Sequence, residues 1–209
     1  QLGYRMALVG SALMRSTNPS RSVAQMVSYG RAAAGVPRVK ICGLKTSRDV
    51  AAAVEAGADG LGFVLVDSPR RVAPERARQL SEGLPAGIAT VGVFRTLDEE
   101  AVEQAHQAGL GWVQGRPTQA GIALASALGI RCLAALTDGP DLSSQLSSQT
   151  GPVLVDGPKS GSGQSADLER VARLAADRPL ILAGGLRPDT VAAVIDQVQP
   201  VGVDVSSGV

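Results

Sequence analysis

Short apolar runs recur along the chain from residue 38 onward, and Ala-rich amphipathic stretches separate them. This alternation is typical of strand–helix units around a parallel sheet, because strands covered on both faces are apolar throughout. Successive runs start about 23 residues apart, which favours a closed α/β (β/α)8 TIM barrel over an open doubly wound sheet. The predicted strands are 39–43, 60–64, 88–94, 111–114, 131–136, 153–156, 180–183 and 201–205.

Helix start and stop signals lie between these runs. Thr46 or Ser47 can cap one helix, and Pro74 stands near the start of the next. The stretch 141–150 is rich in Ser and Gln, so it is predicted to be a loop or one frayed turn. With this weak stretch included, the candidate helices are 47–55, 74–82, 98–108, 118–128, 141–150, 167–176 and 188–198.

One helix of an eightfold barrel is unaccounted for, because the sequence ends at Val209, shortly after the last predicted strand. Residues 18–34 read as a helix with Val23, Met26 and Val27 on one face. In a closed barrel the eighth helix lies beside the first strand. We therefore expect this N-terminal helix to replace the missing last helix; the alternative is a loosely docked leader with the last helix absent.

Composition limits the class of partner. The chain has 20 Lys and Arg against 19 Asp and Glu, a net charge of +1, which removes the electrostatic argument for nucleic acid or an anionic membrane. Two cysteines are too few for a disulfide framework that would stabilise a domain of this size. No segment resembles a signal peptide or a membrane-spanning helix. We expect a cytoplasmic protein that binds a small molecule.

The carboxyl end of the first strand carries the first candidate groups. Side chains alternate along a strand, so Lys40 and Cys42 share one face. A nearby ammonium favours the thiolate, which can abstract a carbon-bound proton or act as a nucleophile. The alternative is a buried structural thiol, and Cys132, near the start of its strand, is assigned to packing.

Two other strand ends carry charged groups. Asp156 ends the sixth strand, where partial burial suits a general acid, although an aspartate that begins a turn with Gly157 would look the same. Arg70 and Arg71 follow the second strand and can clamp a carboxylate, or they are a solvated pair. His106 is expected on an exposed helix face, and no His or Cys cluster has the spacing of metal ligands.

Glycine and serine loops follow the seventh and eighth strands. Barrels commonly hold a phosphate there through backbone N–H groups, although ordinary tight turns also use glycine. The segment 159–164 is a candidate flap over the ligand and is not a Walker loop. The candidate phosphate-loop residues are Gly184, Gly185, Asp204, Ser206 and Ser207.

In their order and spacing these segments resemble the phosphoribosylanthranilate isomerase family of tryptophan biosynthesis. The similarity covers about residues 39–209. It implies a barrel that performs an Amadori rearrangement of N-(5'-phosphoribosyl)anthranilate to 1-(2-carboxyphenylamino)-1-deoxyribulose 5-phosphate, without a cofactor. The matching motifs lie at 40–44, 58–63, 68–70, 91–94, 156 with 161–163, 183–186 and 202–209.

The resemblance also implies roles for individual residues. Asp156 would protonate the ribose ring oxygen, and Cys42 would remove the C2' proton. Arg70 would bind the anthranilate carboxylate. The other substrate-binding residues implied are Lys40, Gly184, Gly185, Asp204, Ser206 and Ser207. We expect a monomer acting on a phosphorylated small molecule.

Residues 1–37 are predicted to be a leader, and 38–209 the isomerase domain. Segment 4–14, followed by Asn18-Pro19, is similar to the last strand and helix of indole-glycerol-phosphate synthase. The two enzymes occur fused in some bacteria, so the chain resembles the isomerase half of such a fusion with a synthase remnant. No synthase activity is predicted.

Three departures from the family pattern leave alternatives open. The family usually has Val-Gln-Leu-His-Gly at 113–117 and Phe-Asp-Trp at 166–168, and it continues beyond 209. These differences motivate a catalytically impaired phosphate-binding barrel as one alternative. Another is a related sugar-phosphate isomerase such as that of histidine biosynthesis, although its family uses an aspartate where Cys42 stands.

Overall fold

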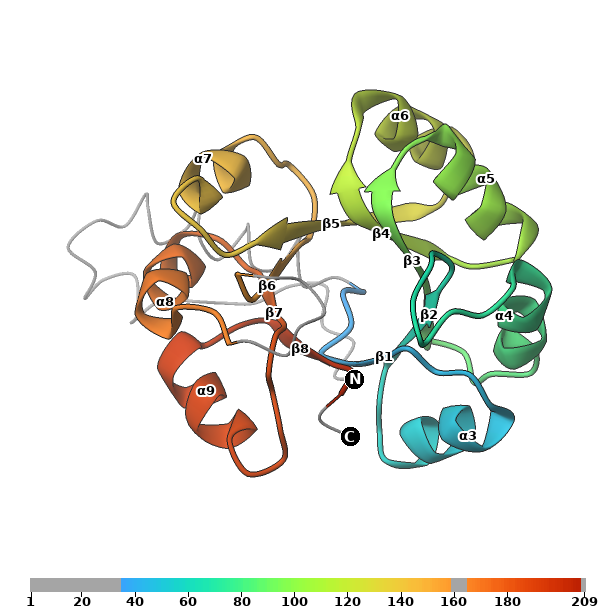
Figure 1. The fold of residues 1–209 in the computed structure, drawn as a ribbon, viewed down its shortest axis with the longest axis horizontal. Coiled ribbons are helices and arrows are strands. Elements are labelled where there is room, and N and C mark those ends of the chain that lie inside the picture. Colours follow the sequence, from blue (N-terminus) through green and yellow to red (C-terminus); the bar gives the residue numbers. More distant parts are fainter. Residues whose placement is uncertain (1–34, 159–164, 208–209) are drawn as a thin grey trace, which may run out of the picture.

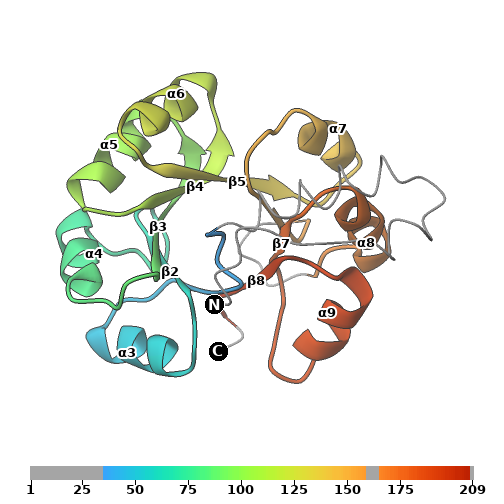
Figure 2. The same ribbon diagram turned by 180° about the vertical axis from the view of Figure 1, so that it is seen from behind.

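A computed structural model describes residues 35–158 and 165–207. These residues form a closed barrel of parallel strands in sequential order, so the predicted (β/α)8 barrel is confirmed. The strands form an inner ring with the helices outside it (Figure 1), as the view from behind also shows (Figure 2). The strands are β1 (Val39–Cys42), β2 (Gly60–Val64), β3 (Ala89–Leu97), β4 (Trp112–Pro117), β5 (Arg131–Thr137), β6 (Val153–Asp156), β7 (Ile181–Leu182) and β8 (Gly202–Val205).

The described helices follow the predicted alternation with the strands. Side-chain caps explain several of their starts: Thr46, Asp98, Thr118 and Asp167 each accept a hydrogen bond from a backbone N–H in the first helical turn. The helices are α3 (Ser47–Glu55), α4 (Pro74–Ser81), α5 (Glu99–Gln107), α6 (Gln119–Ala127), α7 (Leu142–Ser147), α8 (Leu168–Asp177) and α9 (Val191–Val198).

Two helices differ from expectation. Within 141–150, six residues form the regular helix α7, because Leu142 and Leu146 lie one turn apart and both are buried. Helix α9 begins at Val191 rather than at 188. The residues before it form a turn in which the backbone N–H of Thr190 donates to the carbonyl of Arg187.

Strands β3 and β4 extend further than their apolar runs. After a register irregularity between Val93 and Thr96, Thr96 aligns with Arg116 and Leu97 with Pro117. The residues 115–117, which follow the predicted strand 111–114 and were expected to form an altered loop, therefore lie within β4. The ends of both strands include polar residues, so the apolar pattern of the sequence did not reveal that the strands continue.

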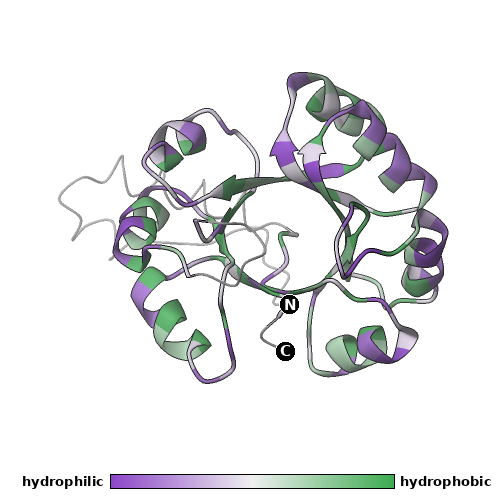
Figure 3. Ribbon diagram, viewed as in Figure 1, coloured by the Kyte–Doolittle hydropathy of each residue, from purple (hydrophilic) through white to green (hydrophobic). Residues whose placement is uncertain are grey.

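The core has an inner and an outer layer. Side chains from alternate strand positions fill the barrel, and apolar faces of the helices pack against the outside of the sheet. Figure 3 shows a ring of mainly hydrophobic strands surrounded by helices that carry both hydrophilic and hydrophobic residues. Within the described part of the chain, no helix is long and apolar enough to span a membrane. The inner layer includes Val91, Trp112, Leu133, Leu154 and Ile181.

The predicted N-terminal helix at 18–34 lies outside the described residues, as does most of the 1–37 leader. Both assignments therefore stay predictions. On the outside of the barrel, α3 and α9 flank the position beside β1 where an eighth helix would lie (Figure 1). The described residues, 35–158 and 165–207, form no helix at that position. Val36, the first buried residue described, joins the inner layer of the barrel core.

The close approach of α6 to β3 depends on Gly121. A Cβ atom there would lie 2.0 Å from the carbonyl oxygen of Leu97, which is backbone and cannot rotate away. We expect Gly121→Ala to lower the free energy of unfolding by about 1–3 kcal/mol, as overpacking does. Urea denaturation measures this. Gly139→Ala, whose Cβ would meet nothing within 4 Å, should change stability far less; equal losses in both variants would contradict the explanation.

Candidate active site

A cleft of about 620 Å³ opens at the carboxyl ends of the strands. Side chains from the ends of all eight strands, or from the residues directly after them, line it. Of the nine predicted site residues, only Lys40 is not in its lining, so one cavity brings together groups from five strands or the loops directly after them. The predicted residues that line it are Cys42, Arg70, Asp156, Gly184, Gly185, Asp204, Ser206 and Ser207.

Lys40 lies beneath this cleft and is fully buried. Its Nζ is 2.8 Å from Oδ1 of Asp204, on the neighbouring strand at the same register. Burial works against the charged ammonium, but the attractions and hydrogen bonds of Asp204 and Cys42 together outweigh it, so the pKa of Lys40 is raised. Burial also raises the pKa of Asp204, with Lys40 opposing that shift. Lys40 therefore supplies a positive charge below the cleft rather than a side chain that lines it.

Cys42 stands two residues further along β1, on the same face as Lys40. Gly62 on β2 leaves room for both, since a Cβ there would lie 2.8 Å from the Cys42 Sγ and 3.0 Å from the Lys40 Nζ. Burial raises the pKa of the Cys42 thiol, while the charges of Lys40 and Arg70 act in the opposite direction. A thiolate with a raised pKa is a strong base, and the neighbouring cations limit the cost of forming it.

Arg70 lies against the turn that ends β1. Gly43 has a φ of +84°, and a Cβ there would be 2.4 Å from the Arg70 Cδ. Glycine at this position therefore allows both the turn and the close passage of the arginine. The loop that carries Arg70 is held by Lys45, whose Nζ donates to the carbonyl of Pro69 at 3.2 Å. A guanidinium so placed can hold a carboxylate at the mouth of the cleft.

Asp156 is half-buried at the end of β6. Its Oδ1 accepts a hydrogen bond from the backbone N–H of Gly157 at 2.8 Å, so it does begin the turn expected of a loop aspartate. It also lines the cleft, and its charge contributes to the raised pKa of Asp204. The two interpretations of Asp156, turn residue and cleft carboxyl group, are therefore compatible.

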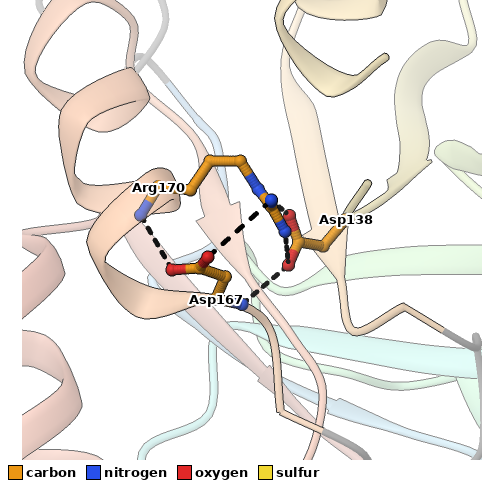
Figure 4. Close-up of polar contacts among 3 residues, drawn as sticks. All are labelled: Asp138, Asp167 and Arg170. Carbon is orange, nitrogen blue, oxygen red and sulfur yellow. Dashed lines mark hydrogen bonds and ion pairs between the residues drawn. The ribbon is translucent and has the colours of Figure 1, made fainter. Parts of the chain in front are cut away.

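A buried carboxylate holds the base of the loop that follows Asp156. Asp138, directly after β5, accepts hydrogen bonds from Nε and Nη2 of Arg170, each at 2.8 Å, and from the backbone N–H of Asp167 at 2.7 Å (Figure 4). The backbone N–H of Asp138 donates to the carbonyl of Asp156 at 2.9 Å. One residue thus joins the end of β6 to the start of α8. Sequence reasoning missed it, although an aspartate directly after an apolar strand was a usable signal.

The loops after β7 and β8 line the side of the cleft next to β1. Gly184 and Gly185 have φ angles of +91° and +65°, a conformation that glycine adopts without strain. Ser206 and Ser207 lie beside them in the lining. Backbone N–H groups and hydroxyls gathered in this way suit a phosphate. The candidate flap at 159–164 lies outside the described residues.

The lining residues missing from the predicted site include three long polar side chains, those of Arg95, Gln114 and Arg116. Arg95 and Arg116 belong to the extended ends of β3 and β4, and both are exposed. Gln114 is buried within β4. The sequence could have indicated Gln114, because it is a polar residue two positions after Trp112 in an otherwise apolar run.

A family model described as N-(5'-phosphoribosyl)anthranilate isomerase matches residues 39–209. The chain belongs to this family. As a phosphoribosylanthranilate isomerase it is an intramolecular aldose–ketose isomerase with the family's TIM-barrel fold. The resemblance identified from the motifs is confirmed, and the proposed fusion with a synthase stays a prediction.

Individual relatives agree with the family assignment. The N-(5'-phosphoribosyl)anthranilate isomerase of Symbiobacterium thermophilum is 42% identical, with 82% of this chain and 89% of the relative covered. The crystal structure of the Thermus thermophilus enzyme is 34% identical and superposes with a TM-score of 0.73, covering 82% and 88% of the two chains. A further structure, also 34% identical with a TM-score of 0.69 over 83% and 89%, holds reduced 1-(o-carboxyphenylamino)-1-deoxyribulose 5-phosphate.

The Asp138 contacts predict a pH-dependent contribution to stability. Burial alone would raise the pKa of Asp138, but Arg170 and the N–H of Asp167 outweigh it, so the pKa is lowered from 3.8. The contribution is therefore complete above that value and is lost as the pH falls through the lower folded-state pKa. We expect Asp138→Asn to lower the Tm by several degrees near neutral pH, with the difference shrinking in acid. A difference that does not depend on pH would contradict this, and Asp141→Asn, an exposed aspartate without a capping bond, is the control.

The charge of Lys40 beside Cys42 leads to a prediction about how alkylation of the thiol depends on pH. In a Cys132→Ala background, Cys42 is the single thiol of the chain. Lys40→Met removes the charge that lowers the thiol pKa and leaves Asp204, which raises it. The pH midpoint of alkylation by iodoacetamide should therefore move upward, whereas Arg173→Met, at an exposed arginine on α8, should leave it in place. Circular dichroism checks that each variant is folded; an unmoved midpoint in folded Lys40→Met would contradict the assignment.

Proposed function

We propose that Cys42 is the base and Asp156 the acid in the isomerisation of N-(5'-phosphoribosyl)anthranilate to 1-(2-carboxyphenylamino)-1-deoxyribulose 5-phosphate. The observation that carries this proposal is that a thiol from β1 and a carboxyl group from β6 line one cleft. Family membership supplies the reaction, a step in tryptophan biosynthesis. Proton transfers at two positions of one sugar need an acid and a base held apart on a rigid frame.

The reaction balances with these two groups alone. Asp156 gives a proton to the ribose ring oxygen as the bond from that oxygen to C1' breaks, which leaves a protonated Schiff base at C1'. Cys42 then removes the proton from C2', and the electron pair of that bond forms the double bond between C1' and C2' while nitrogen recovers its lone pair. The resulting enolamine takes up a proton at C1' and loses one from the C2' hydroxyl, giving the ketone. No cofactor is required.

The remaining residues position the substrate. Arg70 binds the anthranilate carboxylate at the mouth of the cleft. The phosphate lies between the loops that contain Gly184 with Gly185 and Ser206 with Ser207. The Lys40–Asp204 pair stands under Cys42 and keeps a cation near the thiolate as it forms. The analogue held by the relative of known structure has both a phosphate and a carboxylate, which supports this arrangement.

We further propose that the chain acts as a monomer in the cytoplasm, without a nucleic-acid partner. The acid, the base, the guanidinium and the phosphate loops all come from one chain. Both cysteines are free, and a base that works as a thiolate needs a reducing compartment.

The test is steady-state turnover of freshly prepared phosphoribosylanthranilate. Cys42→Ala and Asp156→Ala should each lose about 2–4 kcal/mol of transition-state stabilisation, roughly 30- to 1000-fold in kcat/KM, with folding retained. Cys132→Ala is the matched control, because Cys132 packs in the core outside the cleft. Wild-type turnover in either active-site variant would reject that residue's role. An inactive wild-type chain would favour the impaired phosphate-binding barrel.

A further inference from the structure

Gln114 is the polar side chain of the barrel interior that the proposed reaction leaves unexplained. It is 7% exposed, and its carboxamide oxygen is buried with no hydrogen-bond partner among the residues that the structure describes. Buried polar atoms in folded proteins are nearly always hydrogen-bonded. An orphaned acceptor lowers stability, so it needs a compensating purpose.

The surroundings of Gln114 explain why the described part of the chain leaves this oxygen unpaired. Its register neighbours are Val93 on β3 and Leu133 on β5, and neither side chain can donate a hydrogen bond. Two residues earlier on the same strand face, Trp112 packs in the inner layer of the barrel core. The carboxamide therefore has apolar neighbours on both adjacent strands and below it, and Gln114 is one of the residues that line the cleft.

The position of Gln114 relative to the other lining groups indicates which part of a bound substrate can contact it. Around the closed barrel, β4 is four strands away from β8 and its phosphate loop, and two strands away from both Arg70's strand and Asp156's strand. The middle of a substrate that reaches both Cys42 on β1 and Asp156 on β6 lies across the mouth of the barrel, three strands from β4 on one side and two on the other. That part of the substrate carries hydroxyl groups and an amine N–H.

We propose that Gln114 is a substrate-binding residue whose carboxamide oxygen accepts a hydrogen bond from an O–H or N–H group in the middle of the bound phosphosugar amine. This inference rests on the proposed function for the identity of the substrate. It assigns Gln114 a role in orienting the sugar carbons between Cys42 and Asp156. The free protein tolerates the unpaired oxygen because the ligand satisfies it.

The proposal is tested first by whether removing the Gln114 oxygen raises or lowers the thermal stability of the free protein. Gln114→Met keeps the length of the side chain and removes the unpaired oxygen. In the free protein we expect an unchanged or higher Tm. The same variant should bind reduced 1-(o-carboxyphenylamino)-1-deoxyribulose 5-phosphate at least tenfold more weakly, measured by calorimetry. Gln107→Met, at an exposed position at the end of α5, should change neither quantity.

Two fragments identify the donor. Ribulose 5-phosphate presents hydroxyl groups without the amine, and anthranilate presents the amine and carboxylate without the sugar. If the donor is a hydroxyl, Gln114→Met weakens ribulose 5-phosphate binding and spares anthranilate. If it is the amine, the pattern is reversed.

Every other outcome overturns the proposal. A lower Tm in Gln114→Met, whatever happens to binding, would mean that the oxygen is already satisfied inside the protein. An unchanged Tm with unchanged analogue affinity would mean that no ligand group meets it. Because these measurements are thermal unfolding and binding, they stand apart from turnover: a wild-type chain that binds the analogue and fails to isomerise the substrate would reject the proposed function and leave this inference intact.

Discussion

The buried ion pair between Lys40 and Asp204 lies at the seam where the barrel closes. Its partners are 164 positions apart in the sequence, yet their strands are paired in register and their charged atoms are 2.8 Å apart. A charge removed from water is strongly unfavourable without its partner. The pair is satisfied only when β1 and β8 are adjacent, so the closed ring and the position of Cys42, two residues beyond Lys40, depend on the same contact.

Above this seam, the interior changes from apolar to polar within one or two residues of each strand. Large apolar side chains such as Trp112 and Leu154 fill the barrel below the cleft. The next inward positions carry Gln114 and Asp156. The polar groups therefore stand on a close-packed floor, which limits their movement. Asp138 adds a second constraint from outside the cleft, because it joins the end of β6 to the start of α8.

Much of this arrangement could be predicted from the chain alone. Period, spacing and residue type located all eight strands and placed Cys42, Arg70 and Asp156 at the carboxyl ends. The errors have a common cause. Helix α7 was obscured by Ser and Gln although Leu142 and Leu146 anchor it, and the ends of β3 and β4 continue through polar residues because each strand pairs with the other. Local composition carries no information about such pairing.

The sequence by itself determined the number of strands, the chemistry available at their ends and the family to which the chain belongs, because these depend on periodicity and on short motifs. Only the tertiary structure decided that the Lys40 ammonium lies beneath the cleft, that Asp138 holds the base of a loop and that the Gln114 oxygen has no hydrogen-bond partner within 35–158 and 165–207. Each of these depends on which distant residues become neighbours, and a buried polar group takes its role from the partner it finds or lacks.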